Sequence, residues 1–444
     1  MRTYRRLRQI FLVCTLVLLS FTFSPLSSTG LRSAPGVVRA EAFVSTETRQ
    51  GRLAVFDDVW ETIRARYYDA SFNGLDWEAE RERFRPTAAE AKSPAEFYSV
   101  LRRMLGSLRD AHTRVYSPEE KFDWRHPRVV TTGIYVREVA GLPAVAAVER
   151  GSEAERRGLR AGDIITSIGD EPALELFARR VRDAVGASTA QSVRARALSA
   201  LLGGPAGTSV KVGWRASDGK ERTAVLRREW RDRTARLVLE KSRGDLFVVR
   251  FDAFTQTVAR DFLRSLGNRL RGARGLVLDL RNNGGGDSEA MTDVASVFLS
   301  PRTGLGRFMD RTGRVVVEPR TRRSMLMTAE SIAPFEGSLV ILTSERTSSA
   351  AEIFAASLKE AGRAVIIGTK TCGCVLAIWR KHQLPDGGEL DVSELDYRTG
   401  GGLRLEGVGV EPQETITLDL ADLRAGRDRA IERALERLKA EAGQ

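Results

Sequence analysis

The 444-residue sequence has few of the side chains that cross-link exported proteins or bind metals, with three cysteines and three histidines. Cys14 lies near the N-terminus, which leaves Cys372 and Cys374 in the rest of the chain. Cysteines two residues apart seldom meet disulfide geometry, so we expect no disulfide. A metal site would need further ligands, and only His382 lies near this pair in the sequence. We therefore expect neither a metal ion nor another cofactor.

The sequence also lacks an apolar run that is long enough for a stable membrane span. The run Ile10–Phe23 follows a basic head and precedes a stretch rich in Ser, Pro and Gly. This pattern is typical of an export signal with cleavage near Ala40 or Ala42, and the short run favours cleavage over retention. Residues 1–42 are therefore predicted to be a signal peptide or an N-terminal anchor that contacts the membrane. We expect an exported protein, periplasmic or extracytoplasmic.

No basic stripe accompanies the formal net charge of +12. Arginines are scattered and interleaved with acids, which indicates a solvated surface and no nucleic-acid partner. The length is too great for one small core, and 42% hydrophobic residues can fill several, so we expect two or three domains.

Residues 43–125 are predicted to form a helical unit. Apolar residues recur at helical spacing in segments 55–69 and 97–110, and Pro94 marks a helix start. The second of these helices ends just before Asp-Ala-His-Thr and therefore delivers His112.

Residues 126–230 change to short strands that are separated by glycines. Segments 132–136 and 144–148 are predicted strands, and 151–165 is a helix that leads through a tight turn into a strand. Between 173 and 202 the sequence is helical again.

Residues 231–444 alternate between strands and helices, which predicts an α/β core with a C-terminal helix. The expected strands are 247–251, 276–280, 338–342 and 364–367, and the expected helices are 258–270, 290–299, 423–442 and one that follows the turn at 344–349.

A serine is presented where the strand 338–342 turns into the following helix. A side chain at a helix N-terminus lies beside free backbone N–H groups and the positive end of the helix dipole, which suits a nucleophile. The alternative is that Ser348 or Ser349 is only a helix cap, with Glu352 completing a capping box.

A second loop contains Gly284, Gly285 and Gly286, which permit backbone amides to approach a ligand closely. Together, LVLDLRNNGGG, TSSAAEI and VIIGTKTCG resemble the C-terminal processing (tail-specific) serine proteases, a family that includes the tricorn protease core and the interphotoreceptor retinoid-binding protein. The resemblance spans nearly the whole chain and implies an α+β multidomain fold, with an N-terminal helical unit, a PDZ β-module and an α/β protease core. It places the nucleophile at Ser349.

The pattern Gly-Leu-x-x-Gly-Asp-x-Ile at residues 158–165 resembles a PDZ domain. This resemblance implies that backbone amides around Gly133, Ile134 and Tyr135 capture the C-terminal carboxylate of a peptide, which adds as a strand. The alternative is a structural β-module that binds nothing.

Tail-specific members usually use a lysine as the base, and this chain has Cys374 at that position. The tricorn-like branch uses a histidine, matched here by His112, and an acidic residue, matched by Glu406. The resemblance therefore implies a triad in which Ser349 attacks, His112 accepts and returns the proton, and Glu406 orients the imidazole or stabilises the imidazolium.

The oxyanion of such an enzyme would be held by backbone amides of Ala350 and of Gly285 or Gly286. The implied activity is that of a serine-type peptidase, a hydrolase that forms an acyl-enzyme and recognises substrate C-termini through its PDZ domain. Its partners would be proteins or peptides with free C-termini and an adaptor protein.

Three other functions stay open at this point. A PDZ-containing scaffold could keep the protease fold without activity, because the usual lysine is absent. The retinoid-binding relatives carry apolar ligands, although no apolar surplus in the sequence supports that use. Cys374 could act as a thiol nucleophile, but nothing nearby in the sequence supplies its base.

Overall fold

The structure, a computed structural model, describes residues 44–120, 128–184, 186–242, 244–323 and 333–442. The predicted signal peptide or anchor at 1–42 lies outside these ranges. Within them, no helix is both long and apolar enough to cross a membrane.

A six-stranded sheet forms the centre of the C-terminal part, in the order β10-β11-β12-β15-β16-β19. The strands are β10 (Val238–Lys241), β11 (Leu246–Arg250), β12 (Gly275–Asp279), β15 (Ser338–Thr343), β16 (Val365–Gly368) and β19 (Glu414–Thr415). The strands from β11 to β19 run parallel, and β10 is antiparallel. Their apolar runs are nearly continuous because a parallel sheet is covered on both faces.

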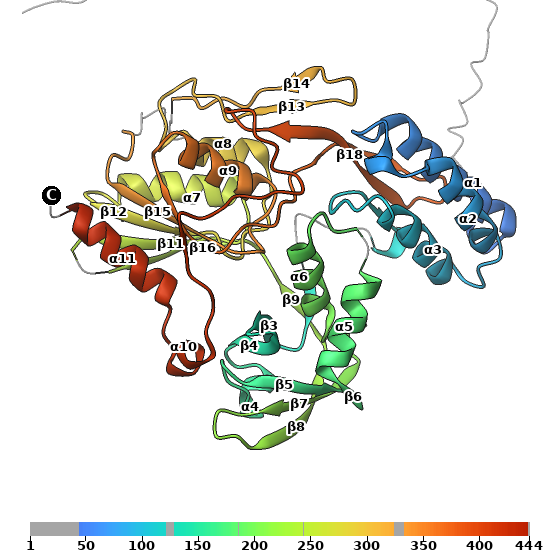
Figure 1. The fold of residues 1–444 in the computed structure, drawn as a ribbon, viewed down its shortest axis with the longest axis horizontal. Helices are drawn as coiled ribbons and strands as arrows, with labels where there is room; N and C mark the ends of the chain where they lie inside the picture. The colour runs from blue at the N-terminus through green and yellow to red at the C-terminus, as the bar shows by residue number, and fades with distance from the viewer. Residues whose placement is uncertain (1–43, 121–127, 185, 243, 324–332, 443–444) are drawn as a thin grey trace, which may run out of the picture. The chain divides into compact units, whose positions relative to one another are not determined.

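Helices cover the two faces of this sheet (Figure 1). One face packs on α7 (Gln256–Gly267), α8 (Ser288–Ala295) and α9 (Ala350–Glu360), and the other packs on α11 (Arg429–Ala442). Within β12, Leu276 and Leu278 face the first group, whereas Val277 faces α11. The α/β core predicted from the alternating pattern is therefore present.

The parallel register brings several loops to one edge of the sheet. Asp279 at the end of β12 pairs with Leu342 near the end of β15, which in turn pairs with Ile367 of β16. The glycine loop, the serine turn and the loop that contains both cysteines therefore all begin at the carboxyl edge. In open α/β sheets this edge is where ligands bind.

Three helices form the N-terminal unit, α1 (Arg49–Arg66), α2 (Trp77–Ala89) and α3 (Pro94–Gly106), with a 3₁₀ turn at Phe72–Gly74. They pack through a shared core on a second sheet in the order β1-β18-β13-β14, with β17 paired to β18. These strands are β1 (Arg114–Tyr116), β13 (Arg307–Met309), β14 (Val315–Val317), β17 (Ala377–Gln383) and β18 (Glu389–Arg398). His382 of β17 binds the helical unit, with its Nε2 atom 2.7 Å from Asp58 Oδ2.

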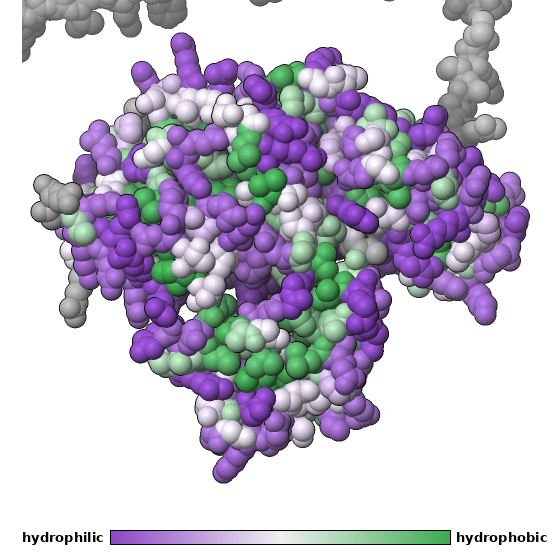
Figure 2. All heavy atoms as spheres, in the orientation of Figure 1, coloured by the Kyte–Doolittle hydropathy of each residue, from purple (hydrophilic) through white to green (hydrophobic). Residues whose placement is uncertain are grey.

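An antiparallel β-module occupies the middle of the chain, in the order β3-β4-β5-β7-β8 with β6 paired to β5. Its elements are β3 (Ile134–Val139), β4 (Leu142–Val148), α4 (Glu153–Arg156), β5 (Ile164–Ile168), β6 (Glu171–Pro172), α5 (Ala173–Asp183), α6 (Ala190–Ala200), β7 (Ser209–Arg215) and β8 (Glu221–Arg227). A two-stranded ribbon, β2 (Arg128–Thr131) with β9 (Glu229–Asp232), links this module to the core. Figure 2 shows apolar residues gathered on the displayed face of the module.

Two helix predictions need correction. The segment 173–202 is not one helix, because α5 ends at Asp183 and Thr189 caps the start of α6. The predicted helix 423–442 is wrong in its first part. A short helix, α10 (Leu420–Ala425), ends at Gly426 with φ 66°, and α11 begins at Arg429. A glycine in the left-handed conformation terminates a helix at low cost.

Candidate active site

The turn between β15 and α9 presents Ser349 at the carboxyl edge of the central sheet. Its backbone has φ 58° and ψ −127°, outside the ordinary range for a residue with a side chain. Strained values of this kind persist only where the surrounding structure holds them, and they are concentrated at active sites. Thr347 helps to hold the turn, because its Oγ1 atom donates to Leu280 O at 2.8 Å and accepts from Ser344 N at 3.0 Å. The strain distinguishes Ser349 from the neighbouring Ser348.

The glycine loop lies directly against this turn. A Cβ atom at Gly285 would stand 2.7 Å from Ser349 Cβ and 2.9 Å from Ser348 O, closer than real contacts allow. The φ of Gly285 is 95°, so the backbone conformation also requires glycine. Ser348 N donates to Asn283 O at 3.1 Å, which joins the two loops.

Of the amides expected to hold an oxyanion, that of Gly285 is already engaged. Gly285 N donates to Asn283 Oδ1 at 2.9 Å, because the Asn283 side chain folds back over its own loop. Across the described ranges, Gly286 N and Ala350 N have no hydrogen-bond acceptor. Of the two glycines offered by the sequence, Gly286 is therefore the one with a free donor.

Charged side chains fix the base of the glycine loop. Arg281 donates to Asp279 Oδ1 at 2.8 Å and to Asp428 Oδ2 at 2.7 Å, and Arg250 donates to Asp279 Oδ2 at 2.8 Å. These contacts hold the pKa of Asp279 below its usual value although burial opposes the shift. The loop that faces Ser349 is thus anchored to β11 and to the start of α11.

His112 lies in the turn that follows α3. Asp110 shapes this turn, since its buried carboxylate accepts His112 N at 2.7 Å and Thr113 N at 3.2 Å. Thr113 Oγ1 in turn accepts Ser393 N of β18 at 3.1 Å. The sequence Asp-Ala-His-Thr therefore forms an Asx-type turn that fixes the backbone of His112.

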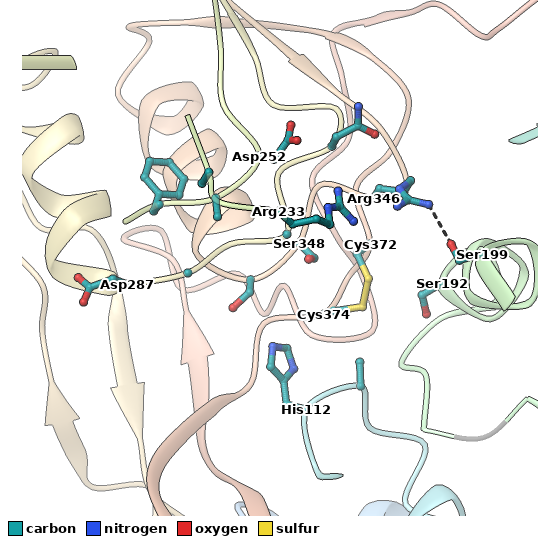
Figure 3. A pocket seen from close by; sticks show the side chains of 18 of the residues that line it. His112, Ser192, Ser199, Arg233, Asp252, Asp287, Arg346, Ser348, Cys372 and Cys374 are labelled. Carbon is teal, nitrogen blue, oxygen red and sulfur yellow. Dashed lines mark hydrogen bonds between the residues drawn. A yellow bond between two sulfur atoms is a disulfide. The ribbon is translucent and has the colours of Figure 1, made fainter. Parts of the chain in front are cut away.

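The His112 ring lines a cleft of about 1220 Å³ that Ser349 also lines. Its Nδ1 atom is buried and has no hydrogen-bond partner within the described part of the chain. Burial lowers the pKa of His112 to about 4, with Asp110 opposing this shift and Arg114 adding to it. The imidazole is therefore neutral near pH 7 and can accept a proton. Figure 3 shows the ring pointing toward the loop of Cys374.

Glu406 lies in a turn after β18 and is 6% exposed. Its Oε2 atom accepts Val375 N at 2.6 Å, and the Ser188 side chain lies near its carboxylate. Burial raises the pKa of Glu406 to about 7, and Ser188 and the Val375 amide oppose this shift. The sequence predicts that Glu406 orients His112, but no hydrogen bond joins them in the described structure. The carboxylate is turned toward Val375 and Ser188, so the role of Glu406 toward His112 stays a prediction.

Ser188 is a residue of this site that the sequence did not indicate. Its hydroxyl lies near the Glu406 carboxylate and lowers the pKa of that residue, and its Oγ atom accepts Ala111 N at 3.3 Å. It therefore connects Glu406 to the residue before His112. Ser188 lies between α5 and α6, in a segment for which the sequence predicted only helix, and no local motif marks it.

A second buried glutamate, Glu352 in the first turn of α9, supports the Ser349 turn. Its carboxylate accepts Ser349 N at 3.1 Å, Thr371 Oγ1 at 2.5 Å, Gly373 N at 2.7 Å and Cys374 N at 2.9 Å. Burial raises the pKa of Glu352 to about 7, and the four hydrogen bonds oppose that shift. Ser349 is also the N-cap of α9, so one residue can both cap the helix and present a nucleophile.

Cys372 and Cys374 form a disulfide, contrary to the expectation from their spacing. Their Cα atoms are 5.2 Å apart. Gly373 between them has φ 70°, and this left-handed conformation brings the flanking residues to disulfide distance. While the bond is intact, Cys374 carries no thiol that could act as a nucleophile. Among the described residues, no group of three or more His, Cys, Asp or Glu side chains could hold a metal ion.

The three residues expected to bind a peptide carboxylate lie at the start of β3. Gly133 N is engaged, because it donates to Thr131 Oγ1 at 3.0 Å. Ile134 is buried and pairs with Val148, whereas Tyr135 is 42% exposed. β3 is an edge strand of its sheet and α6 packs beside it. An edge strand beside a helix is the arrangement that peptide addition requires.

Comparisons with known proteins match the central core and the N-terminal helices to known families. Residues 245–416 match peptidase family S41, and residues 49–106 match the tricorn protease C1 domain. A carboxyl-terminal-processing protease of Picosynechococcus is 27% identical over 378 residues, which cover 80% of this chain and 81% of that protein. The chain carries a peptidase family S41 domain. This S41 member is a serine-type peptidase, and its relatives make it a protease of the carboxyl-terminal-processing kind.

Solved structures share the fold of this S41 peptidase. The photosystem II D1 C-terminal processing protease has a TM-score of 0.52 at 25% identity and covers 82% of this chain and 93% of its own. Mature CPAF has a TM-score of 0.64 at 14% identity and covers 89% and 96%, which shows the fold alone. The predicted α+β fold and the resemblance to the tail-specific family are thereby confirmed.

Proposed function

We propose that this S41 peptidase is an exported endopeptidase that cleaves peptide bonds through an acyl-enzyme on Ser349. The observation that carries the proposal is the strained Ser349 turn, which lines one cleft with a neutral histidine. Ser349 Oγ attacks the scissile carbonyl and expels the amine, and water then hydrolyses the resulting ester.

His112 is the general base and then the general acid in this proposal. Its pKa of about 4 keeps the imidazole neutral and ready to accept the Ser349 proton. Among the described residues, no hydrogen bond yet joins the ring to Ser349. Catalytic hydrogen bonds are often long in the free enzyme and shorten when substrate binds. A bound peptide that closes the cleft would bring the His112 ring within hydrogen-bonding distance of the Ser349 hydroxyl.

Glu406 stabilises the imidazolium by its charge and acts on His112 through Ser188. The imidazolium needs such a charge, because burial disfavours the protonated ring. Ser188 accepts the amide of Ala111 and lies near the Glu406 carboxylate, so it stands between Glu406 and the residue that precedes His112. Glu406 is ionised only above its pKa of about 7, which makes its contribution pH-dependent.

The oxyanion of the tetrahedral intermediate is held by the amides of Gly286 and Ala350. Both lack an acceptor within the described ranges, and Ala350 N lies at the positive end of α9. Each donor of this type lowers the barrier by roughly 3 kcal/mol.

The substrates are proteins or peptides with free C-termini, which the β-module at 126–230 binds as a PDZ domain. The peptide would add beside β3, facing α6, where Arg194 of α6 and Glu138 of β3 form an ion pair across the groove. Gly133 N becomes available for the carboxylate when the Thr131 side chain rotates away. The segment 1–42 directs export.

Fluorophosphonate labelling of the intact protein tests the proposed function. Wild type and Ser348→Ala should be labelled, because both keep the Ser349 nucleophile, and Ser349→Ala should not be labelled. An unlabelled wild type, or a Ser349→Ala variant that still reacts, would favour the inactive scaffold, which keeps the fold without the chemistry.

A further inference from the structure

The disulfide stands inside the candidate active site. Both cysteines line the cleft with Ser349 and His112, and Figure 3 shows the bond beside His112 and Ser348. Ala111, which precedes His112, packs on both sulfur-bearing residues. One of the two half-cystines, Cys374, occupies the position where tail-specific relatives usually carry their lysine.

The loop closed by this bond holds the nucleophile. Cys374 O accepts Ser349 N at 2.9 Å, and Cys372 N donates to Thr347 O at 2.9 Å. Gly373 N and Cys374 N donate to Glu352, whose carboxylate also accepts Ser349 N. The strained backbone of Ser349 therefore depends on the conformation of this loop.

The same loop contacts the other parts of the site. Thr189 at the start of α6 donates its hydroxyl to Cys372 O at 2.7 Å, and Gly407 N donates to Gly373 O at 2.9 Å. Val375 N, immediately after the bond, donates to Glu406. A change in the conformation of this loop would therefore alter its contacts with the β-module and with Glu406, as well as the position of the nucleophile.

The bond itself constrains little of the chain as a whole. It closes a ring across one intervening residue, and the entropy that a disulfide removes from the unfolded state grows with loop length. Its effect should therefore be local. The surroundings of Gly373 are tightly packed, because a Cβ atom at this position would meet Thr189 Cγ2 at 2.8 Å and Val408 N at 3.1 Å. A small change in the loop therefore displaces its neighbours.

We propose that Cys372–Cys374 is a redox site that sets the activity of this peptidase, an inference that rests on the proposed function. The oxidised form holds the Ser349 turn in its reactive conformation. A dithiol reductant supplies two electrons and two protons, the sulfur–sulfur bond breaks, each sulfur becomes a thiol, and the reductant becomes a disulfide. The loop then loses its constraint and the Ser349 backbone relaxes.

Reduction of the full-length protein with dithiothreitol, followed by removal of the reductant, tests this site. Alkylation and peptide mass mapping should show two new thiols on the peptide that carries Cys372 and Cys374. The fluorophosphonate labelling rate should fall by about 10²-fold, the effect of a small displacement of a catalytic group. The rate should recover on reoxidation, while the thermal unfolding midpoint changes little.

Variants separate the site from general effects of the reductant. The double variant Cys372→Ser/Cys374→Ser should have the low rate of the reduced protein and no response to dithiothreitol. Cys14→Ser, which leaves the loop intact, should behave as wild type. If oxidised and reduced wild type are both labelled and at the same rate, or if both thiols are free before reduction, the inference is overturned.

A second readout keeps this inference distinct from the proposed function. Hydrogen exchange should become faster on reduction at the amides of Ser349, Gly373 and Cys374, because their acceptors depend on the loop. If neither redox form is labelled, the proposed function fails, and exchange alone then decides whether the bond controls the turn. Unchanged exchange at these amides would overturn the inference.

Discussion

Burial shifts the ionisable residues around the cleft in opposite directions. It lowers the pKa of His112 to about 4 and raises the pKa of Glu406 and of Glu352 to about 7. Near pH 7 the histidine is neutral, while the two glutamates are only partly ionised. Acidification therefore removes negative charge from the glutamates first and protonates the base last.

The pH dependence of kcat/KM should reflect this order. We expect activity to fall in two steps as the pH is lowered, through about 7 as Glu406 gains a proton and through about 4 as His112 gains one. Glu406→Gln should remove the upper step and lower the plateau by roughly 10⁴-fold, the cost of losing a supporting acid. An unchanged profile in this variant would exclude Glu406 from the mechanism.

His112→Ala should cost as much activity as Ser349→Ala, on the order of 10⁶-fold in kcat, because members of a catalytic unit fail together. His382→Ala is the matched control, since this histidine binds Asp58 in the helical unit and should be dispensable for chemistry. Peptide hydrolysis at saturating substrate provides the measurement. Substantial turnover by His112→Ala would contradict the assignment of the base.

At the scale of elements, the sequence predicted the turns that carry clear turn residues and missed two features that each depend on one left-handed glycine. The Ser349 turn and the glycine loop could be predicted because each follows an apolar strand and carries its own turn residues. The disulfide was missed because a general rule about cysteine spacing ignores the left-handed Gly373. The break at Gly426 was missed for the same reason, since charge alternation continues across it.

The glycine loop approaches the Ser349 turn closely, so alanine substitutions at Gly285 and Gly284 should have different effects. Gly285→Ala should destabilise the protein by about 1–3 kcal/mol and impair activity, since its Cβ would meet Ser349 Cβ at 2.7 Å in a positive-φ backbone. Gly284→Ala should be tolerated, because the nearest atom to its Cβ, Ser348 Oγ, is 4.0 Å away. Chemical denaturation and peptide hydrolysis measure both variants. Equal effects would contradict the close approach of the loops.

At the scale of the whole molecule, the site combines residues that lie far apart in the sequence. The helical unit supplies His112, the segment between α5 and α6 supplies Ser188, and the core supplies Ser349 and Glu406. The sequence predicted the helical unit, the β-module and the core, and the family resemblance pointed to Ser349, His112 and Glu406. The contact of Ser188 with Glu406 was beyond prediction, because it depends on how the β-module packs on the core.

A free C-terminus should matter if the β-module is a PDZ domain. We expect a peptide with a free carboxylate to bind more tightly than its amidated twin, because the amides near Gly133 would pair with a negative charge. Isothermal titration with the Ser349→Ala variant avoids cleavage during the measurement. Equal affinities would show that the β-module does not bind the C-terminal carboxylate of the peptide.

The claim that a histidine replaces the usual lysine is tested most directly by the rate of fluorophosphonate labelling as a function of pH. The account predicts that the wild-type rate rises only at or below about pH 7, stays level toward pH 10, and is lost in His112→Ala. A lysine base would instead produce a rise at higher pH, toward its usual pKa of about 10.4. A rise of that kind that persists in His112→Ala would contradict the account.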